Sequence, residues 1–348
     1  MQQIIGIIFH FIGGFSSASF YVPYNLIKKW SWQTYWISLG FVAWIIMPPI
    51  GGLLTTPDLF GILSQSPLSS KVQTYLFGIL WGFGGLGAGL GLRYLGLSLG
   101  QSISLGVCAI VGTLVPAIMD NKIELLVSTI PGGIIMVGFL LCIIGIVFCG
   151  YAGVLKDRML TDDQKKESVK EFSAVKGITM AVLGGVMSAC MAIAIKSGEP
   201  IAAQAIKAGT AEVFMNIPIF VFALAGGFTT NFVYTLIFIV RTKSYKGYAI
   251  QPPQTLFRNF SMSILSGLMW YGQFFFYGMG TTKMGKFDFA SWSIHMASII
   301  IFSNLWGLWL KEWSLVNRKT QIYLWTGISL LILSVFFIGI GNNMAGKV

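Results

Sequence analysis

Apolar residues in this chain are gathered into long runs that short polar stretches separate. Ten runs occur, at about 4–24, 35–54, 74–93, 97–118, 132–154, 176–195, 214–240, 260–281, 288–310 and 321–342. Their lengths are close to the ~20 residues that a helix needs to cross the hydrocarbon core of a bilayer. They do not alternate apolar and polar residues with a period of two, as the strands of a membrane barrel do. The pattern therefore predicts an all-α integral membrane protein with ten transmembrane helices.

One polar stretch is longer than the others and lies near the middle of the chain. It reads KDRMLTDDQKKESVKEFSAVK and covers residues 156–176, with five apolar runs before it and five after it. We therefore expect a first five-helix unit at 1–155, a cytoplasmic linker at 156–176 and a second five-helix unit at 177–348. The stretch 196–213 is only weakly apolar and has no clear place in this scheme.

The two units share short motifs in the same order. FIGGFSSASF at 11–20 matches VLGGVMSACM at 182–191, and GILW at 78–81 matches GLMW at 267–270. Two repeats that each have an odd number of helices must cross the membrane in opposite directions. Inverted repeats are typical of secondary transporters, whose substrate site lies at the repeat interface near the middle of the bilayer.

The composition supports a membrane protein. Charged residues form 10% of the chain, against ~25% in soluble domains. Apolar residues form 55% and the mean hydropathy is +0.75, so a soluble chain of this kind would expose large apolar patches. The net charge of +11 does not indicate nucleic-acid binding, because the Lys and Arg residues lie between the apolar runs and form no basic face.

The basic residues predict an orientation. The stretches after the first, third, fifth, seventh and ninth runs hold 16 Lys and Arg residues, and the other stretches and tails hold 7. Basic residues collect on the cytoplasmic side of membrane proteins, so we expect both termini outside the cytoplasm. The first charges, Lys28 and Lys29, follow the first apolar run, which favours a retained helix over a cleaved signal peptide.

Cofactor and enzyme chemistry find little support in the sequence. The four cysteines, Cys108, Cys142, Cys149 and Cys190, lie in apolar runs without a CxxC or Cys/His pattern, so we expect small buried side chains. The chain has two histidines and no clustered acids. No nucleophile–base pair is visible either. We therefore expect no metal, no cofactor and no enzymatic activity.

The stretch FDFASWSIHM, residues 287–296, places ionisable residues in an apolar run. Asp288 and His295 are about two helical turns apart, so one helix face can carry both, with Trp292 between them. His10 lies in the first run among apolar residues and glycines. Ionisable residues are costly inside a membrane and by default indicate function. Since histidine titrates near neutral pH, His10, Asp288 and His295 are candidates for binding a coupling proton.

The stretch WYGQFFFYG, residues 270–278, places Trp270, Gln273 and Tyr277 on one helix face. An aromatic ring packs against the C–H face of a sugar while an amide binds its hydroxyls, so this face suits the wall of a sugar cavity. Structural interpretations stay open. Trp270 and Tyr277 also suit interface anchors, and Gln273 can bond to a neighbouring helix. Asp288 can lie at the membrane surface, and each histidine can be an ordinary core residue.

Four groups of residues occur together in a recognisable order. They are SASFYVPYNLIKKWSW, LRYLGLSLG followed by IVGTLVP, WYGQFFFYG, and FDFASWSIHM leading to LKEW. They resemble the L-rhamnose–proton symporter family, which belongs to the drug/metabolite transporter superfamily, and they extend from His10 to Trp313. The resemblance implies ten helices, inverted five-helix repeats and uptake of L-rhamnose with a proton across the bacterial inner membrane.

We therefore expect a sugar importer that works by alternating access. The residues that we expect to contact the substrate are Trp81, Trp270, Gln273, Tyr277 and Trp292, and those that we expect to couple the proton are His10, Asp288 and His295. Its expected partners are the lipid bilayer and a small neutral sugar, and sodium stays open as the coupling ion. Stoichiometry and oligomeric state are not defined by the sequence.

The chain departs from the resemblance after Trp81. It reads GFGGLGAG at 82–89, where we expect asparagine and aromatic residues from the family. The glycines at 78, 82, 85 and 89 instead predict a small face for helix packing. Another sugar or small metabolite, or the role of a membrane sugar sensor, therefore stays open as an alternative.

Overall fold

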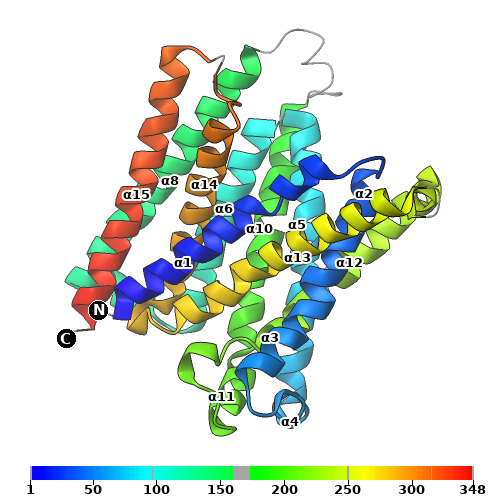
Figure 1. The fold of residues 1–348 in the computed structure, drawn as a ribbon. Coiled ribbons are helices and arrows are strands. Elements are labelled where there is room, and N and C mark those ends of the chain that lie inside the picture. Colours follow the sequence, from blue (N-terminus) through cyan, green and yellow to red (C-terminus); the bar gives the residue numbers. More distant parts are fainter. Residues whose placement is uncertain (1, 96, 160–172, 249–250, 315, 347–348) are drawn as a thin grey trace.

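The computed structural model describes residues 2–95, 97–159, 173–248, 251–314 and 316–346, and every regular element in these ranges is helical. The long helices are α1 (Gln2–Ser19), α5 (Leu68–Leu95), α6 (Leu97–Met119), α8 (Ile130–Arg158), α10 (Ala174–Ser197), α12 (Ile219–Thr242), α13 (Pro253–Thr281), α14 (Ser291–Trp309) and α15 (Arg318–Ala345). The shorter ones are α2 (Trp32–Gly40), α3 (Met47–Thr55), α4 (Leu59–Gln65), α7 (Ile123–Ser128) and α11 (Glu199–Lys207). The helices pack into one bundle (Figure 1).

All ten apolar runs coincide with helices. Nine of them match one long helix each, and the run at 35–54 consists of α2 and α3 joined by a π-helical turn at Phe41–Ile46. Among the described residues, seven stretches are long and apolar enough to cross a membrane: Gln2–Leu26, Trp32–Thr55, Leu99–Met119, Ile130–Arg158, Val175–Lys207, Glu212–Thr242 and Arg318–Ala345. The fold is therefore that of an all-helical, multi-pass membrane protein.

The helices α13 and α14 carry polar side chains that the bundle buries. Asn259 and Gln273 of α13 are 0% and 6% exposed, and His295 and Ser298 of α14 are both 0% exposed. Polar groups within membrane proteins are usually turned toward the bundle interior, where they can be paired or used. These two helices therefore lie at the centre of any site that the bundle forms.

The helix α1 lies alongside α13 and crosses α14 at close range (Figure 1). A Cβ atom at Gly13 would lie 2.9 Å from the backbone oxygen of Gln273, and one at Gly14 would overlap the side chain of Ser298. The absence of side chains at these two positions lets the backbones approach closely. This close packing brings the polar residues of α1 against those of α13 and α14.

The segment GFGGLGAG of α5 is a packing surface. A Cβ atom at Gly84 would lie 2.5 Å from the backbone nitrogen of Ser188 on α10, and one at Gly82 would lie 2.7 Å from the Thr230 Cβ atom on α12. Nothing lies within 4 Å of the corresponding position at Gly85. The expected small face at 78, 82, 85 and 89 is therefore only half right, because α5 packs on two helices and the contacts to α10 use another set of glycines.

One end of the bundle is covered by short helices. The stretch 196–213, which had no clear place in the sequence, includes α11, and its Gln204 Nε2 donates to Gln65 Oε1 of α4 at 3.0 Å. Both ends of the described chain lie at this same end of the bundle (Figure 1). Residues 160–172 of the expected linker lie outside the described residues.

Candidate functional site

Two buried histidines meet inside the bundle. His10 of α1 and His295 of α14 are both 0% exposed, and their ring centroids are 6.2 Å apart in an edge-to-face arrangement. Neither nitrogen of either ring has a hydrogen-bond partner among the described residues. Burying a polar atom without a partner costs free energy. The pair is therefore poorly explained as ordinary core packing and is a candidate for function.

Glycines on the neighbouring helices make room for both rings. A Cβ atom at Gly280 of α13 would lie 2.7 Å from Cε1 of His10, and one at Gly13 of α1 would lie 3.2 Å from Cε1 of His295. A larger residue at either position would push an imidazole aside. The two glycines therefore create the space that the imidazole rings occupy.

Tyr277 of α13 packs against both histidines. Its ring centroid lies 5.4 Å from that of His10, 5.2 Å from that of His295 and 5.7 Å from that of Trp292. Such separations are typical of favourable aromatic pairs. The tyrosine ring is therefore the common neighbour of the histidine pair and of the tryptophan.

Tyr277 also lines a cavity of about 320 Å³. The other lining residues are Gly112, Pro116, Asp120, Ala192, Ile195, Lys196, Glu199, Ala202, Ala203, Met215, Asn216, Thr281, Thr282, Asp288 and Phe289. Most of the wall is apolar, and the charged groups gather at the end of the bundle that carries α11. Ligand pockets of ~300–1,000 Å³ with a mostly apolar wall and a few placed polar groups suit small molecules.

Lysines and carboxylates form a connected network at the mouth of this cavity. Lys122 Nζ donates to Asp288 Oδ1 at 2.6 Å and lies 3.1 Å from Asp120 Oδ2. Lys196 pairs with Asp120 and with Glu199. Asp120 and Lys122 follow α6, whereas the other three come from the later half of the chain. The network therefore ties the two halves together across the cavity.

The network shifts the pKa values of its members. Partial burial on its own raises the pKa of Asp120, but hydrogen bonds from Lys196 and Lys122 outweigh it and leave that pKa lowered. Partial burial likewise lowers the pKa of Lys122, but the hydrogen bond to Asp288 and its charge leave that pKa raised. Both groups therefore stay charged at neutral pH.

Asp288 and His295 lie on two successive elements. The helix α14 begins at Ser291, and Asp288 belongs to a preceding 3₁₀ turn, η5 (Gly285–Ala290), in which Phe287 has non-helical backbone angles. Asp288 lies at the cavity mouth beside Lys122, whereas His295 is fully buried in the bundle. Since the break at Phe287 precedes Asp288, the common face of Asp288 and His295 stays a prediction.

Comparison with known proteins decides the family. The family model described as L-rhamnose-proton symport protein (RhaT) matches residues 1–345. This chain belongs to the RhaT family. The L-rhamnose-proton symporter of Yersinia pestis (strain Pestoides F) is 34% identical over 342 residues, covering 97% of this chain and 98% of the relative. The L-rhamnose-proton symporter of Escherichia coli (strain K12 / DH10B) is 35% identical over 340 residues, covering 97% of each chain.

Membership in the RhaT family confirms the resemblance found in the sequence and makes the chain a transporter, not an enzyme. The match extends over nearly the full length of both relatives. The departure at GFGGLGAG therefore does not remove the chain from the RhaT family, and the packing of α5 accounts for Gly82, Gly84 and Gly87.

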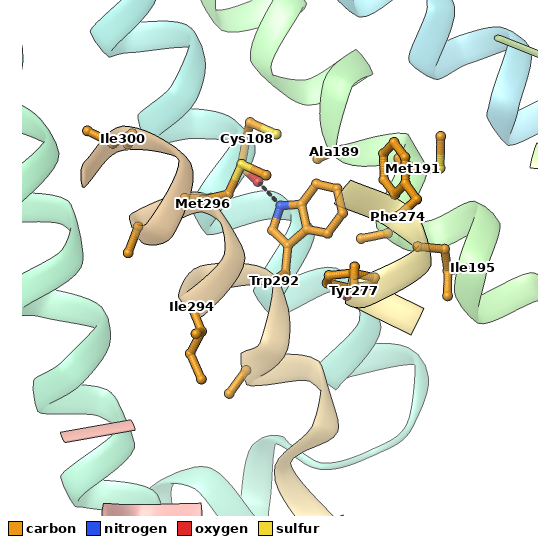
Figure 2. Close-up of a cluster of buried hydrophobic side chains, with 14 of the residues drawn as sticks. Cys108, Ala189, Met191, Ile195, Phe274, Tyr277, Trp292, Ile294, Met296 and Ile300 are labelled. Atoms are coloured by element: carbon orange, nitrogen blue, oxygen red, sulfur yellow. Dashed lines mark hydrogen bonds between the residues drawn. The ribbon is translucent and has the colours of Figure 1, made fainter. Parts of the chain in front are cut away.

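The structure of this RhaT-family chain brings only some of the expected substrate contacts to the cavity. Tyr277 lines it, and Trp292 packs directly behind it on Gly112, where a Cβ atom would overlap the indole nitrogen. The Nε1 atom of Trp292 donates to the backbone oxygen of Cys108 at 3.1 Å (Figure 2). Trp292 thus lies between α6 and α14 at the inner end of the cavity.

The remaining three lie away from the cavity lining. Gln273 Oε1 accepts a hydrogen bond from Ser17 Oγ at 2.8 Å, which joins α13 to α1. Trp81 and Trp270 have ring centroids 5.6 Å apart, and Trp44 packs against Trp270 at 5.1 Å. The structure therefore agrees with the interpretation in which Gln273 forms a hydrogen bond to a neighbouring helix.

Sequence reasoning missed the charged residues at the cavity mouth. Asp120, Lys122, Lys196 and Glu199 follow or end apolar runs, and their charges appeared to be ordinary loop charges. Positive and negative charges occur together at the ends of two apolar runs, 97–118 and 176–195, which belong to different halves of the chain. This pattern is the signal that could have identified them. Their pairing depends on tertiary structure and has no sequence spacing of its own.

Proposed function

We propose that this chain carries L-rhamnose together with a proton across the bacterial inner membrane by alternating access. The support is membership in the RhaT family and the printed activity of its relatives. The structural observation that carries the proposal is the position of Tyr277. Its ring packs against His10 and His295, and the residue also lines the cavity. A sugar in the cavity and a proton on the histidines would therefore share one neighbour.

The cavity offers the chemistry that a neutral deoxy sugar needs. The carboxylates of Asp120 and Asp288 accept hydrogen bonds from hydroxyl groups, and such charge-assisted bonds are the stronger ones. The apolar side chains of Ile195, Met215 and Phe289 can cover the methyl group and the C–H faces of the ring. The Tyr277 ring adds an aromatic surface at the inner end. Trp292 supports this wall from behind.

The histidine pair is our candidate for the proton site. A neutral imidazole has one nitrogen that accepts a proton, and none of the four ring nitrogens is occupied by a partner in the described part of the chain. Two imidazolium rings so close together would repel each other, so the pair binds one proton. Tyr277 can face the resulting cation with its ring. Asp288, which we expected to couple the proton, is assigned instead to the cavity mouth.

We further propose ten transmembrane helices in two inverted five-helix halves, 1–155 and 177–348, within the drug/metabolite transporter superfamily. An even number of crossings agrees with both chain ends lying at one end of the bundle (Figure 1). The excess of Lys and Arg after odd-numbered runs favours both termini outside the cytoplasm. In that orientation the cavity opens outward.

Coupling one proton to one neutral sugar moves one charge inward. A membrane potential of ~100 mV supplies ~2.3 kcal/mol to such a step, and each unit of pH gradient adds ~1.4 kcal/mol. Together they support accumulation of the sugar by roughly 10²- to 10³-fold.

Uptake of labelled L-rhamnose into proteoliposomes tests the proposal. An inward pH gradient should drive accumulation, and a protonophore should abolish it. Accumulation that follows a sodium gradient and resists the protonophore would replace the proton by sodium. If verified proteoliposomes take up another sugar and not L-rhamnose, the substrate assignment is wrong. Saturable binding without flux would favour a sugar sensor.

A further inference from the structure

A second cavity of about 320 Å³ lies at the opposite end of the bundle. It lies where α6 begins and where α8 and α14 end, far along these helices from α11 and the chain termini. Its polar lining residues are Gln101, Ser102, Lys156, Ser303, Asn304 and Glu312. The mechanism proposed above makes no use of these residues.

The helix α6 lines both cavities. Gly112 and Pro116 near the end of α6 line the first cavity, and Gln101 and Leu105 near its beginning line the second. Along the segment formed by η5 and α14 the order is reversed, because Phe289 of η5 lines the first cavity and Asn304 of α14 lines the second. The interface of α6 and α14 therefore runs from one cavity to the other.

Trp292 closes this interface between the two cavities. Its indole donates to the backbone oxygen of Cys108 and packs on Gly112. Both contacts fall on the part of α6 between Leu105 and Pro116. The side chain is only 2% exposed, and Figure 2 shows it held between Cys108 on one side and Tyr277 on the other.

The second cavity has the composition of a site for a neutral, hydroxyl-rich ligand. Trp313 provides an indole ring, with Lys156 Nζ 4.5 Å from its centroid. The same Nζ lies 3.8 Å from Glu312 Oε2, so the two opposite charges balance and an anion gains no net attraction. Amide and hydroxyl groups from α6 and α14 complete the wall. An aromatic ring with amides, hydroxyls and one carboxylate is suited to binding a sugar.

We infer that the second cavity is a second binding site for the transported sugar, which the sugar occupies on the far side of Trp292. The inference rests on the proposed function, because it takes the same sugar as ligand. It assigns Asn304 and Glu312 to hydrogen bonds with sugar hydroxyls at this site. Asp288 serves the first cavity in the corresponding way.

Sided transport kinetics test this second site. Right-side-out and inside-out membrane vesicles expose opposite ends of the protein, and L-rhamnose exchange without a pH gradient gives a KM for each end. Glu312→Gln is expected to raise the KM about 10-fold from one side and to leave the other side within about twofold. Asp288→Asn is the matched variant and should raise the KM from the opposite side.

Equal changes of KM on both sides, or none on either, would overturn the second site. Absence of L-rhamnose exchange in the unchanged protein would instead refute the proposed function. A labelling experiment covers the case in which Glu312→Gln does not reach the membrane. Cys149 also lines this cavity, so Ser303→Cys is made together with Cys149→Ala, and L-rhamnose should slow alkylation of the new thiol while sucrose should not. The same alkylation rate with and without L-rhamnose would overturn the inference.

Discussion

His10 and His295 place their rings 6.2 Å apart, although one lies near the start of the chain and the other near its end. No hydrogen bond within the described ranges satisfies their nitrogens. Because both are fully buried, the protein maintains two unpaired imidazoles at the point where α1 crosses α14. This relationship leads to the first two predictions.

Replacing either histidine should uncouple sugar movement from the proton. His295→Gln and His10→Gln remove the titrating group but keep a polar side chain of similar reach. We expect accumulation driven by a pH gradient to fall from roughly 10²-fold to about onefold. Exchange of L-rhamnose without a gradient should continue. Full gradient-driven accumulation by the His295→Gln protein would show that this histidine does not bind the coupling proton.

The ring of Tyr277 should matter more than its hydroxyl group for the link between the two sites. Tyr277→Phe keeps the ring contacts with His10, His295 and Trp292, whereas Tyr277→Leu loses them. We expect the leucine variant to raise the exchange KM by about 10-fold and to lose most accumulation, since aromatic contacts of this kind contribute ~0.5–1.5 kcal/mol each. The phenylalanine variant is the control and should keep most of its coupling. Wild-type behaviour of the leucine variant would contradict the role.

Asp120 should stabilise the protein without setting the pH dependence of transport. Its lowered pKa means that its contribution is present above the ordinary value of ~3.9 and is lost as the pH falls through the lowered pKa. The raised pKa of Lys122 means that its contribution is present below ~10.4 and is lost as the pH rises through the raised pKa. Neither group therefore changes charge between about pH 5 and 8.

Asp120→Asn is therefore expected to keep the shape of the wild-type pH profile of uptake while lowering the thermal midpoint in detergent. His295→Gln should instead flatten the pH profile of uptake and leave the thermal midpoint unchanged. A flattened pH profile for Asp120→Asn would show that the titrating group lies at the cavity mouth.

Trp292 should act as the barrier to leakage. Trp292→Ala removes the indole from the α6–α14 interface, so downhill exchange of L-rhamnose should persist or increase while accumulation is lost. Cys108→Ala is the matched control, because the hydrogen bond uses the backbone oxygen of residue 108 and survives the substitution. Retained accumulation with Trp292→Ala would show that another group separates the cavities.

The glycines of α5 allow a direct test of the packing surface. Gly84→Ala should lower the free energy of unfolding by about 1–3 kcal/mol, since the added methyl group meets backbone atoms of Ser188. Gly85→Ala provides the control one residue away, where no atom lies within 4 Å. Thermal unfolding in detergent measures both. Equal stability of the two variants would mean that α5 and α10 are not packed as closely as described.

The apolar runs predicted nearly all of the helices, because the length of an apolar run that can cross the bilayer is a local property of the sequence. A break in backbone regularity was harder to predict. Gly285 has a φ of +60° and Phe287 is non-helical, so the residues before α14 form a separate 3₁₀ turn that carries Asp288. The pairing of Lys122 with Asp288 joins distant segments, and no periodicity within either segment encodes it. The sequence identified the two histidines as separate candidates, but it did not predict that they are neighbours.

The shared lining of the two cavities has a mechanical consequence. The helix α6 and the segment formed by η5 and α14 bound the first cavity at one end and the second cavity at the opposite end. A tilt of this pair about the contact between Trp292 and the backbone oxygen of Cys108 therefore moves its two ends in opposite directions. Any movement that widens one mouth narrows the other. Simultaneous opening of both mouths would dissipate the ion gradient. It would require the two helices to separate along their whole length.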